Sequence, residues 1–218
     1  KNLNYIMREL PPLFLGLDEL SSNIEINFEL LNIGLPFMET LIEIINEPHI
    51  NVQIIDKDGF LLKSLNNYNS IRDVDLLFSI GLNINEEYIG TNSAGLALIN
   101  QKPIEVVGAE HYCQLMQNNA CYAAPIFSSE GGIAAVLNLV GEVSSSSKYI
   151  LGMIVAAARA IENELQLKVT HNKIIQQNME QQEIINTVTD GILYVNNKDI
   201  ITQVNNVMVE MSGIKQDD

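Results

Sequence analysis

The sequence predicts an α+β protein in which an antiparallel sheet is flanked by helices and followed by a long connecting helix. Segments of helical and strand periodicity follow in the order helix, hairpin, helix, three strands and long helix, and short turns between strands favour antiparallel pairing. Hydrophobic residues make up 47% of the 218 residues and charged residues 18%, a balance typical of a packed globular core. This length accommodates one or two domains.

The first predicted elements are a helix and a hairpin. Over residues 28–46 apolar side chains recur at steps of three and four, at Leu31, Leu35, Met38, Ile42 and Ile45. This spacing predicts an amphipathic helix. Two β-prone segments follow at 52–55 and 60–65, and Lys57-Asp58-Gly59 between them is a turn signal. Together they predict a β-hairpin.

The middle of the chain is predicted to contain two helices and three strands. The helices cover residues 71–78 and 92–99, and Thr91 or Asn92 can cap the second, because short polar side chains accept hydrogen bonds from the free N–H groups at a helix start. Strand-forming runs lie at 104–107, 121–127 and 133–140. Residues 128–132 make the turn between the last two.

A long helix is predicted from Tyr149 to about Thr187. A pattern of this length without a stop signal indicates a connector rather than a packed globular helix. The seam of this helix contains the apolar residues Ile154, Ala158, Ile161 and Leu165. Asn172 and Gln182 continue the seam with polar side chains, which can fix the register of paired helices at a cost in stability. We therefore expect a homodimer paired through this helix.

Residues 188–218 contain two short β-runs around Asn197-Lys198-Asp199 and a short predicted helix at 205–211. A segment of this size is too small to form a domain with its own core. We therefore expect the sequence to end inside a domain.

Charge and cysteine content narrow the class of protein. The formal net charge of −15 repels phosphate backbones and anionic lipid headgroups, so direct binding to nucleic acid or to a membrane is not expected. No apolar run is long enough to span a bilayer, and the first residues lack a signal-peptide pattern. The two cysteines do not form a dense disulfide framework, which suits a reducing compartment. These features predict a cytoplasmic protein.

Two groups of polar residues are candidates for ligand contacts. Thr91 and Asn92 follow Gly90 and precede a helix of small residues, so hydroxyl, amide and helix N-terminal N–H groups can converge there on the oxygen atoms of a ligand. A helix cap beside a turn glycine explains the same residues. Glu110 and His111 could bind a polar effector, with His111 changing charge near neutral pH, or could form a structural hydrogen bond that orients a loop.

Cys113 and Cys121 are the two cysteines, and His111 lies near the first. Metal ligation would need closer pairs or a fourth donor at conventional spacing, and neither is evident. Cys121 opens a predicted strand, where a small buried residue packs well. Inert core cysteines are therefore favoured over metal or redox chemistry. The predicted ligand-binding set is Thr91, Asn92, Glu110, His111 and Cys121, with no catalytic residue, metal or cofactor.

An ordered series of motifs resembles a known family. It begins with EYIGTNSAGLAL at residues 87–98, continues through Pro103 and VVGAEH at 106–111, and ends with CYAAPIF at 121–127. Over roughly residues 28–167 the chain is similar to the N-terminal GAF domain of sigma-54-dependent transcriptional activators, in the subgroup of acetoin and glycerol regulators. The acid–imidazole pair in the second motif is the most distinctive polar part of this resemblance, which favours a ligand-binding role for it.

The tail DGILYVNNKDIITQVNNVMVEMSGI, residues 190–214, resembles the opening of a PAS domain. In such domains a first hairpin leads into a helix, which would begin here at Asn205. The two resemblances imply four segments: an N-terminal segment at 1–27, a GAF sensor domain at 28–148, a connector helix at 149–187 and a truncated PAS domain at 188–218.

In this family, GAF and PAS sensors precede an AAA+ ATPase and a helix-turn-helix DNA-binding domain. This sequence contains neither a GxxxxGK phosphate loop nor a basic recognition helix. The resemblance implies a sensory region that binds a small-molecule effector, pairs as a homodimer through its connector helix, and acts on DNA and sigma-54 RNA polymerase through other domains.

Three alternatives remain open. GAF folds include a free methionine sulfoxide reductase that uses cysteine chemistry, and this reaction would need an exposed thiolate of low pKa with a resolving thiol. Other GAF domains are metal or redox sensors. The long connector and partial PAS segment argue against the enzyme, since a stand-alone enzyme needs neither. A purely structural dimerisation module is the third alternative.

Overall fold

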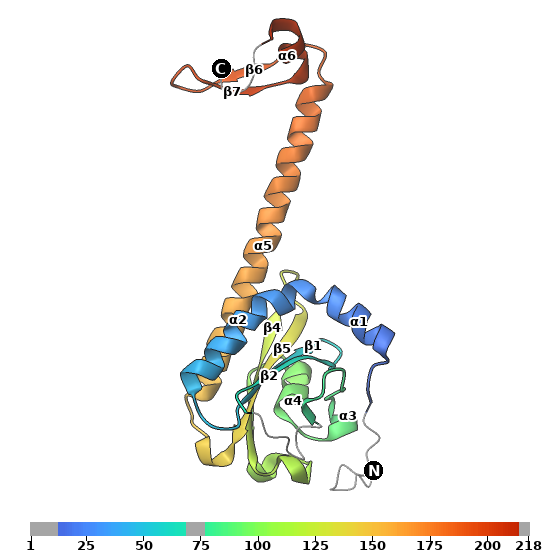
Figure 1. The fold of residues 1–218 in the computed structure, drawn as a ribbon, viewed down its shortest axis with the longest axis vertical. Helices are drawn as coiled ribbons and strands as arrows, with labels where there is room; N and C mark the ends of the chain where they lie inside the picture. The colour runs from blue at the N-terminus through green and yellow to red at the C-terminus, as the bar shows by residue number, and fades with distance from the viewer. Residues whose placement is uncertain (1–12, 69–76, 214–218) are drawn as a thin grey trace. The chain divides into compact units, whose positions relative to one another are not determined.

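The computed structural model describes residues 13–68 and 77–213. The chain divides into two compact units, Lys1–Gln166 and Leu167–Asp218. The first is built around a five-stranded sheet with helices on its faces, and the second contains a two-stranded hairpin and a short helix (Figure 1). Within the described ranges, none of the helices combines the length and the apolar character that crossing a bilayer requires.

The sheet of the first unit has the strand order β2-β1-β5-β4-β3. Its strands are β1 (Asn51–Asp56), β2 (Leu61–Asn66), β3 (Ile104–Val107), β4 (Asn119–Phe127) and β5 (Ile133–Glu142). Every neighbouring pair is antiparallel, which confirms the predicted fold class of an antiparallel sheet flanked by helices. The predicted hairpins β1–β2 and β4–β5 are both present, and pairing of β1 with β5 joins them.

The helices confirm most of the predicted pattern. They are α1 (Leu17–Ile26), α2 (Phe28–Ile45), α3 (Glu86–Ile89), α4 (Ser93–Asn100) and α5 (Ile150–Thr187). The helices predicted at 28–46, 92–99 and 149–187 correspond to α2, α4 and α5. The apolar pattern does not predict α1, because no residue of α1 is buried. The helix predicted at 71–78 falls almost entirely outside the described residues.

The sheet separates two apolar cores, because successive side chains of a strand point to opposite faces. Cys121 and Ala123 of β4 belong to the core on the α4 side, whereas Tyr122 and Ala124 belong to the core shared with α2 and α5. Both faces of the central strands are therefore covered, and eight of the nine residues of β4 are buried. Double-sided burial explains why a continuous apolar run, rather than an alternating pattern, marks this strand.

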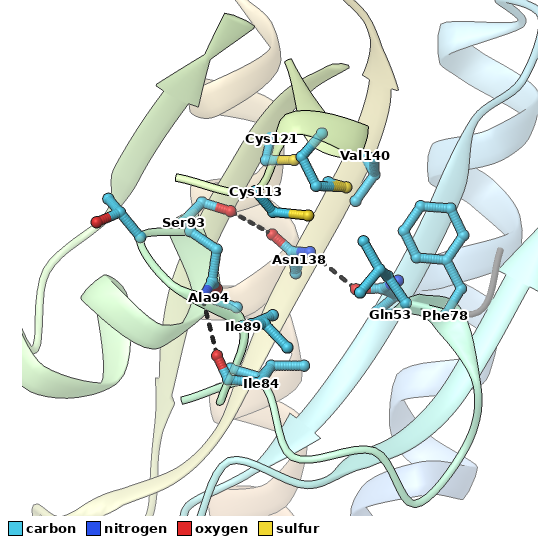
Figure 2. A pocket seen from close by; sticks show the side chains of 14 residues that line it. Gln53, Phe78, Ile84, Ile89, Ser93, Ala94, Cys113, Cys121, Asn138 and Val140 are labelled. Carbon is cyan, nitrogen blue, oxygen red and sulfur yellow. Dashed lines mark hydrogen bonds between the residues drawn. The ribbon is translucent and has the colours of Figure 1, made fainter. Parts of the chain in front are cut away.

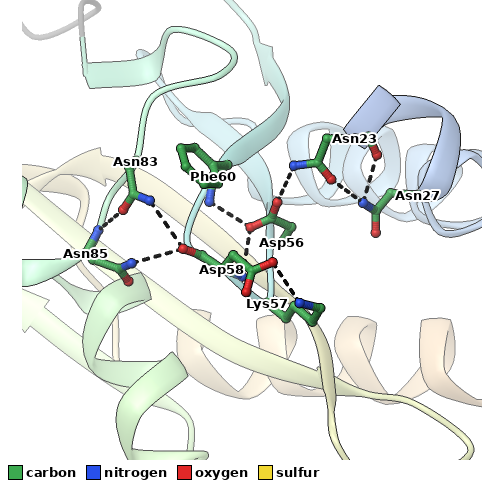
Figure 3. Close-up of polar contacts among 8 residues, drawn as sticks. All are labelled: Asn23, Asn27, Asp56, Lys57, Asp58, Phe60, Asn83 and Asn85. Atoms are coloured by element: carbon green, nitrogen blue, oxygen red, sulfur yellow. Dashed lines mark hydrogen bonds and ion pairs between the residues drawn. The ribbon is translucent and has the colours of Figure 1, made fainter. Parts of the chain in front are cut away.

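A polar cluster ties α1 to the turn between β1 and β2 (Figure 3). Asp56 is 2% exposed, and its Oδ1 accepts hydrogen bonds of 2.9 and 2.7 Å from two backbone N–H groups of the turn. Its Oδ2 accepts a hydrogen bond from the amide of Asn23 in α1. The amides of Asn83 and Asn85 both donate to the carbonyl oxygen of Asp58. These bonds fix the hairpin turn and hold the segment that leads to α3 beside it.

The second unit confirms the elements predicted near the end of the sequence. They are the antiparallel strands β6 (Leu193–Val195) and β7 (Ile201–Val204), followed by α6 (Asn206–Ser212). Asn205 is fully buried, and its Oδ1 accepts hydrogen bonds from the backbone N–H groups of Met208 at 3.0 Å and Ile192 at 2.8 Å. Its Nδ2 donates to the carbonyl oxygen of Asp190 at 2.9 Å. One side chain thus caps α6 and anchors the hairpin.

A candidate ligand cavity under α4

A small cavity lies between α4 and the strands of the first unit (Figure 2). Its volume is about 30 Å³, roughly enough for two water molecules. One part of its wall is apolar and includes Leu77, Phe78, Ile84, Ile89 and Val140. Another part is polar and consists of Gln53, Thr91, Asn92, Ser93 and Asn138. Such a combination of apolar lining with a few placed polar groups is typical of small-molecule sites.

The loop before α4 shapes one side of this cavity. The Asn92 side chain caps the helix, because its Oδ1 accepts a hydrogen bond of 2.8 Å from the backbone N–H of Gly95. Its Nδ2 donates to the carbonyl oxygens of Ile84 at 2.8 Å and Gly90 at 2.9 Å. Thr91 lines the cavity beside it. Asn92 therefore holds the loop together with hydrogen bonds and also forms part of the cavity wall.

A row of buried polar side chains crosses the cavity floor (Figure 2). The Ser93 hydroxyl donates to Asn138 Oδ1 at 2.8 Å, and Asn138 Nδ2 donates to Gln53 Oε1 at 2.9 Å. The three residues come from α4, β5 and β1, and all are at most 5% exposed. Gln53 Nε2 has no hydrogen-bond partner among the described residues. The row therefore ends in a buried N–H donor that can still bind an acceptor.

Both cysteines line the same cavity, together with Met116. Cys113 is 4% exposed and Cys121 is 2% exposed, and neither is in a disulfide. Burial raises the pKa of both thiols above the usual value, and for Cys121 a hydrogen bond with Ser93 opposes this effect only in part. The two thiols are therefore neutral at physiological pH and contribute a weakly polar surface.

Glu110 and His111 do not belong to the cavity wall. Glu110 is exposed, and its Oε2 accepts a hydrogen bond of 2.7 Å from the backbone N–H of Val107 at the start of a short 3₁₀ turn. His111 is 2% exposed, with Nδ1 lying 3.1 Å from the carbonyl oxygen of Gly108. Of the five predicted ligand-binding residues, the structure thus brings Thr91, Asn92 and Cys121 together and places this pair elsewhere. Ligand contacts by the pair stay a prediction.

Burial lowers the pKa of His111 below its usual 6.5, against opposing effects of the Gly108 carbonyl and the Glu110 charge. Its Nε2 is buried without a partner among the described residues. As the pH falls, His111 takes up its proton near pH 6.5 in the unfolded chain and at a lower pH in the folded protein. The folded protein therefore keeps its full stability above pH 6.5 and loses stability as the pH drops below this value. Replacing His111 with leucine is expected to reduce the loss of stability between pH 7.5 and 5.5.

Urea unfolding of wild type and variant across this range measures the difference in slope. His171, which is exposed on α5, supplies the control, in which the same substitution is made at a histidine outside the core. Equal pH slopes for wild type and H111L would show that His111 does not bind its proton more weakly in the folded state.

The sequence patterns did not single out Gln53, Ser93 and Asn138 as site residues. A usable signal was present, since Gln53 lies among the apolar residues Val52, Ile54 and Ile55 of NVQIID, and Asn138 interrupts the apolar run AAVLNLVG. A polar residue inside a strand that is buried on both faces must find a partner. The interruption alone, however, does not reveal which partner is opposite.

Comparison with known proteins places this chain among the N-terminal regions of transcriptional regulators. The family described as the MimR N-terminal domain matches residues 21–164, which include the sheet, the cavity and the first part of α5. The chain belongs to this family.

Two curated relatives illustrate the class. A signal-transduction and transcriptional-control protein of Clostridium beijerinckii is 29% identical over 202 residues, covering 92% of this chain and 32% of that protein. The acetoin dehydrogenase operon transcriptional activator AcoR of Bacillus subtilis is 31% identical over 134 residues, covering 61% of this chain and 22% of AcoR. The chain therefore spans a third or less of the length of these relatives.

Solved structures share the fold. A chain of the Escherichia coli DhaR(N)–DhaL complex matches with a TM-score of 0.85 and 19% identity, covering 94% of this chain and 70% of that chain. An IclR homologue of Microbacterium hydrocarbonoxydans, complexed with 4-hydroxybenzoate, matches with a TM-score of 0.52 and 15% identity, covering 70% and 78% of the two chains. At these identities the matches establish the fold alone.

Proposed function

We propose that this chain is the sensory region of a sigma-54-dependent transcriptional regulator, in which a small metabolite binds the cavity under α4 and changes the state of α5. The named relatives are transcriptional activators and control proteins, and the sequence motifs resemble those of GAF and PAS sensors. In this proposal residues 28–148 form the GAF sensor, 149–187 the connector and 188–218 the start of a PAS domain. DNA and sigma-54 RNA polymerase are contacted through other domains.

The main support is that the cavity and α5 contact opposite faces of the same two strands. On β4, Cys121 lines the cavity, and the next residue, Tyr122, packs in the core that contains Ile154 of α5. On β5, Asn138 lines the cavity, and Leu139 packs in that same core. A displacement of either strand by a ligand is therefore transmitted to the side chains that hold the start of α5.

A hydrogen bond adds a polar link along this route. The hydroxyl groups of Tyr122 and Ser146 lie 2.7 Å apart. Tyr122 is fully buried, and Ser146 lies in the short segment that leads into α5 at Ile150. The link joins a cavity-bearing strand to the start of the connector helix.

The energetics set a condition on this mechanism. A ligand shifts an equilibrium between two arrangements of α5 only by the ratio of its affinities for them, however tightly it binds. Thr91, Asn92 and Cys121 are the predicted ligand-binding residues that line the cavity. Contacts from these residues must therefore differ between the two arrangements.

We also propose a homodimer paired through α5. In the second unit this helix exposes several large apolar side chains, at Leu167, Val169, Ile174, Ile175, Met179 and Ile184. Exposed apolar residues spaced along a helix favour pairing with a second helix.

The cysteine-dependent alternatives receive less support. A catalytic or redox-sensing cysteine is accessible and has a lowered pKa, whereas Cys113 and Cys121 are buried and burial raises their pKa values.

Native mass spectrometry of the purified chain in the presence of reductant tests the proposal. We expect a dimer that carries a small organic molecule, and loss of that molecule in Ala94→Leu, because Ala94 lines the cavity and a larger side chain fills it. Circular dichroism of this variant checks that it is folded. If wild type binds a metal and Cys121→Ser loses it, the metal-sensor alternative is favoured. If Ala94→Leu is folded and keeps the bound molecule, the cavity is ruled out as the binding site.

A further inference from the structure

We propose that the cavity selects a small uncharged molecule with a carbonyl or hydroxyl oxygen, and that Gln53 is the residue that determines this selectivity by donating a hydrogen bond to that oxygen. This inference rests on the proposed function, since it names the class of molecule that the sensor cavity takes. It follows from the direction of the hydrogen bonds in the cavity floor, from the burial of Gln53 and from the composition of the wall.

The hydrogen bonds in the floor all run in one direction (Figure 2). The Ser93 hydroxyl donates to Asn138, and Asn138 donates to Gln53. Asn138 accepts through Oδ1 and donates through Nδ2, and Gln53 accepts through Oε1. The N–H donor that is left at the end of the row is therefore Gln53 Nε2. This atom has no hydrogen-bond partner among the described residues. Gln53 lines the cavity, so the row ends at an unpartnered N–H donor that belongs to a residue of the cavity wall.

The burial of Gln53 gives this donor its importance. Gln53 is 3% exposed, so bulk water does not hydrogen-bond to its amide. A buried donor without a partner is costly, and an acceptor that enters the cavity recovers the cost. A carbonyl or hydroxyl oxygen has this property, whereas an apolar molecule of the same shape does not. Sites built around a buried hydrogen-bonding group discriminate strongly against analogues that lack the matching group.

The described residues of the wall carry no charge. Among the described residues that line the cavity, none is Asp, Glu, Lys, Arg or His. An ion transferred into such surroundings loses its hydration and finds no opposite charge. Carboxylates, phosphates and ammonium groups are therefore disfavoured as ligands. Phe78, Ile89 and Val140 supply apolar surface for the carbon atoms of the ligand.

The volume limits the size of the ligand. At about 30 Å³, the cavity holds about two water molecules, so the ligand must be small and the wall must widen to admit more than a few non-hydrogen atoms. Three probes of five non-hydrogen atoms differ mainly in charge: 2-butanone is neutral and accepts a hydrogen bond, propanoate is an anion, and butylammonium is a cation. Comparison of these probes separates the effect of charge from that of size.

The experiment is an NMR titration of the wild-type chain with each probe at equal concentration, after removal of any co-purified molecule. We expect 2-butanone to bind at least tenfold more tightly than propanoate or butylammonium, with the largest shifts at Gln53, Ser93 and Asn138. Tighter binding of either ion, or equal binding of all three, would overturn the proposed class. Failure of 2-butanone to bind at millimolar concentration would do the same.

A variant tests the role of Gln53 separately. Gln53→Met keeps the side-chain volume and removes the amide, and we expect it to weaken 2-butanone binding about tenfold, the loss of one hydrogen bond. Asn51→Leu is the matched control, because Asn51 is a buried amide on the same strand that bonds Ser64 and does not line the cavity. The control is expected to bind 2-butanone like the wild type. Unchanged binding of 2-butanone by Gln53→Met would exclude Gln53 as the determinant of selectivity. If this variant does not fold, the comparison of the three probes with wild-type protein still decides the ligand class.

Failure of this inference is distinguishable from failure of the proposed function. A charged molecule found in the native protein, and displaced by Ala94→Leu, would refute the uncharged class and leave the sensor proposal standing. A native protein without any bound molecule, together with no binding of the three probes, would count against both.

Discussion

Replacement of Gly90 by alanine is expected to destabilise the protein by about 3 kcal/mol, from backbone strain and overpacking together. Gly90 has φ of 75° and ψ of −172°, a region that is open essentially only to glycine. A β-carbon at this position would also lie 2.6 Å from Cβ of Tyr112. Since that atom is bound directly to the backbone, it cannot move aside by a side-chain rotation. The variant must therefore shift the loop that places Thr91 and Asn92 in the cavity wall.

Urea unfolding followed by circular dichroism measures this effect. Gly132→Ala serves as the control, because Gly132 is exposed and its added β-carbon would meet no atom within 4 Å. Its stability is expected to change by less than about 0.5 kcal/mol, as for other unconstrained surface positions. Similar unfolding midpoints for the two variants would show that the loop before α4 accepts a side chain at Gly90 without strain.

Replacement of Tyr122 by alanine is expected to cost about 4 kcal/mol, as for other large aromatic residues in a core. Tyr122 is fully buried between the sheet and the helices α2 and α5. Tyr122→Phe removes only the hydroxyl that bonds Ser146, and the expected cost is about 1 kcal/mol.

The informative readout for Tyr122→Phe is amide hydrogen exchange in the first turns of α5. We expect faster exchange there than in wild type, because the link to Ser146 is lost. Tyr149→Ala provides the comparison, since Tyr149 is 68% exposed just before the helix and its loss is expected to change stability by less than about 0.5 kcal/mol. Identical exchange in α5 for wild type and Tyr122→Phe would mean that the hydroxyl pair does not hold the helix.

The strands and the longer helices could be predicted because their signals are local. The run from Cys121 to Phe127 is apolar throughout, and the spacing of Leu31, Leu35 and Met38 is helical. The helix α1 escaped prediction because it buries no residue and so leaves a weak apolar pattern. The antiparallel class followed from the order of the elements and from short turns, without knowledge of which strands are neighbours.

The candidate site could be predicted only where it is local in sequence. Thr91 and Asn92 precede a small-residue helix, and this pattern points to the cavity wall directly. The polar row is different, because Gln53 and Asn138 are partners across the β1–β5 pairing and are far apart in the chain. That pairing depends on how two hairpins meet, which a single sequence does not reveal. The pair Glu110-His111 gave a strong local signal. Its hydrogen bonds to Val107 and Gly108 lie outside the cavity wall, and its ligand contacts stay a prediction.

In the proposed mechanism, β4 and β5 couple the cavity to the connector helix. Hydrogen exchange measured by mass spectrometry tests this coupling most directly. The two samples are wild-type protein with the expected small molecule bound and the same protein after removal of that molecule. The proposal predicts slower exchange in the loaded protein at the cavity wall, in β4 and β5, and also in α5 from Ile150 to about Gln166. Slower exchange at the cavity wall alone, with unchanged exchange throughout α5, would contradict it.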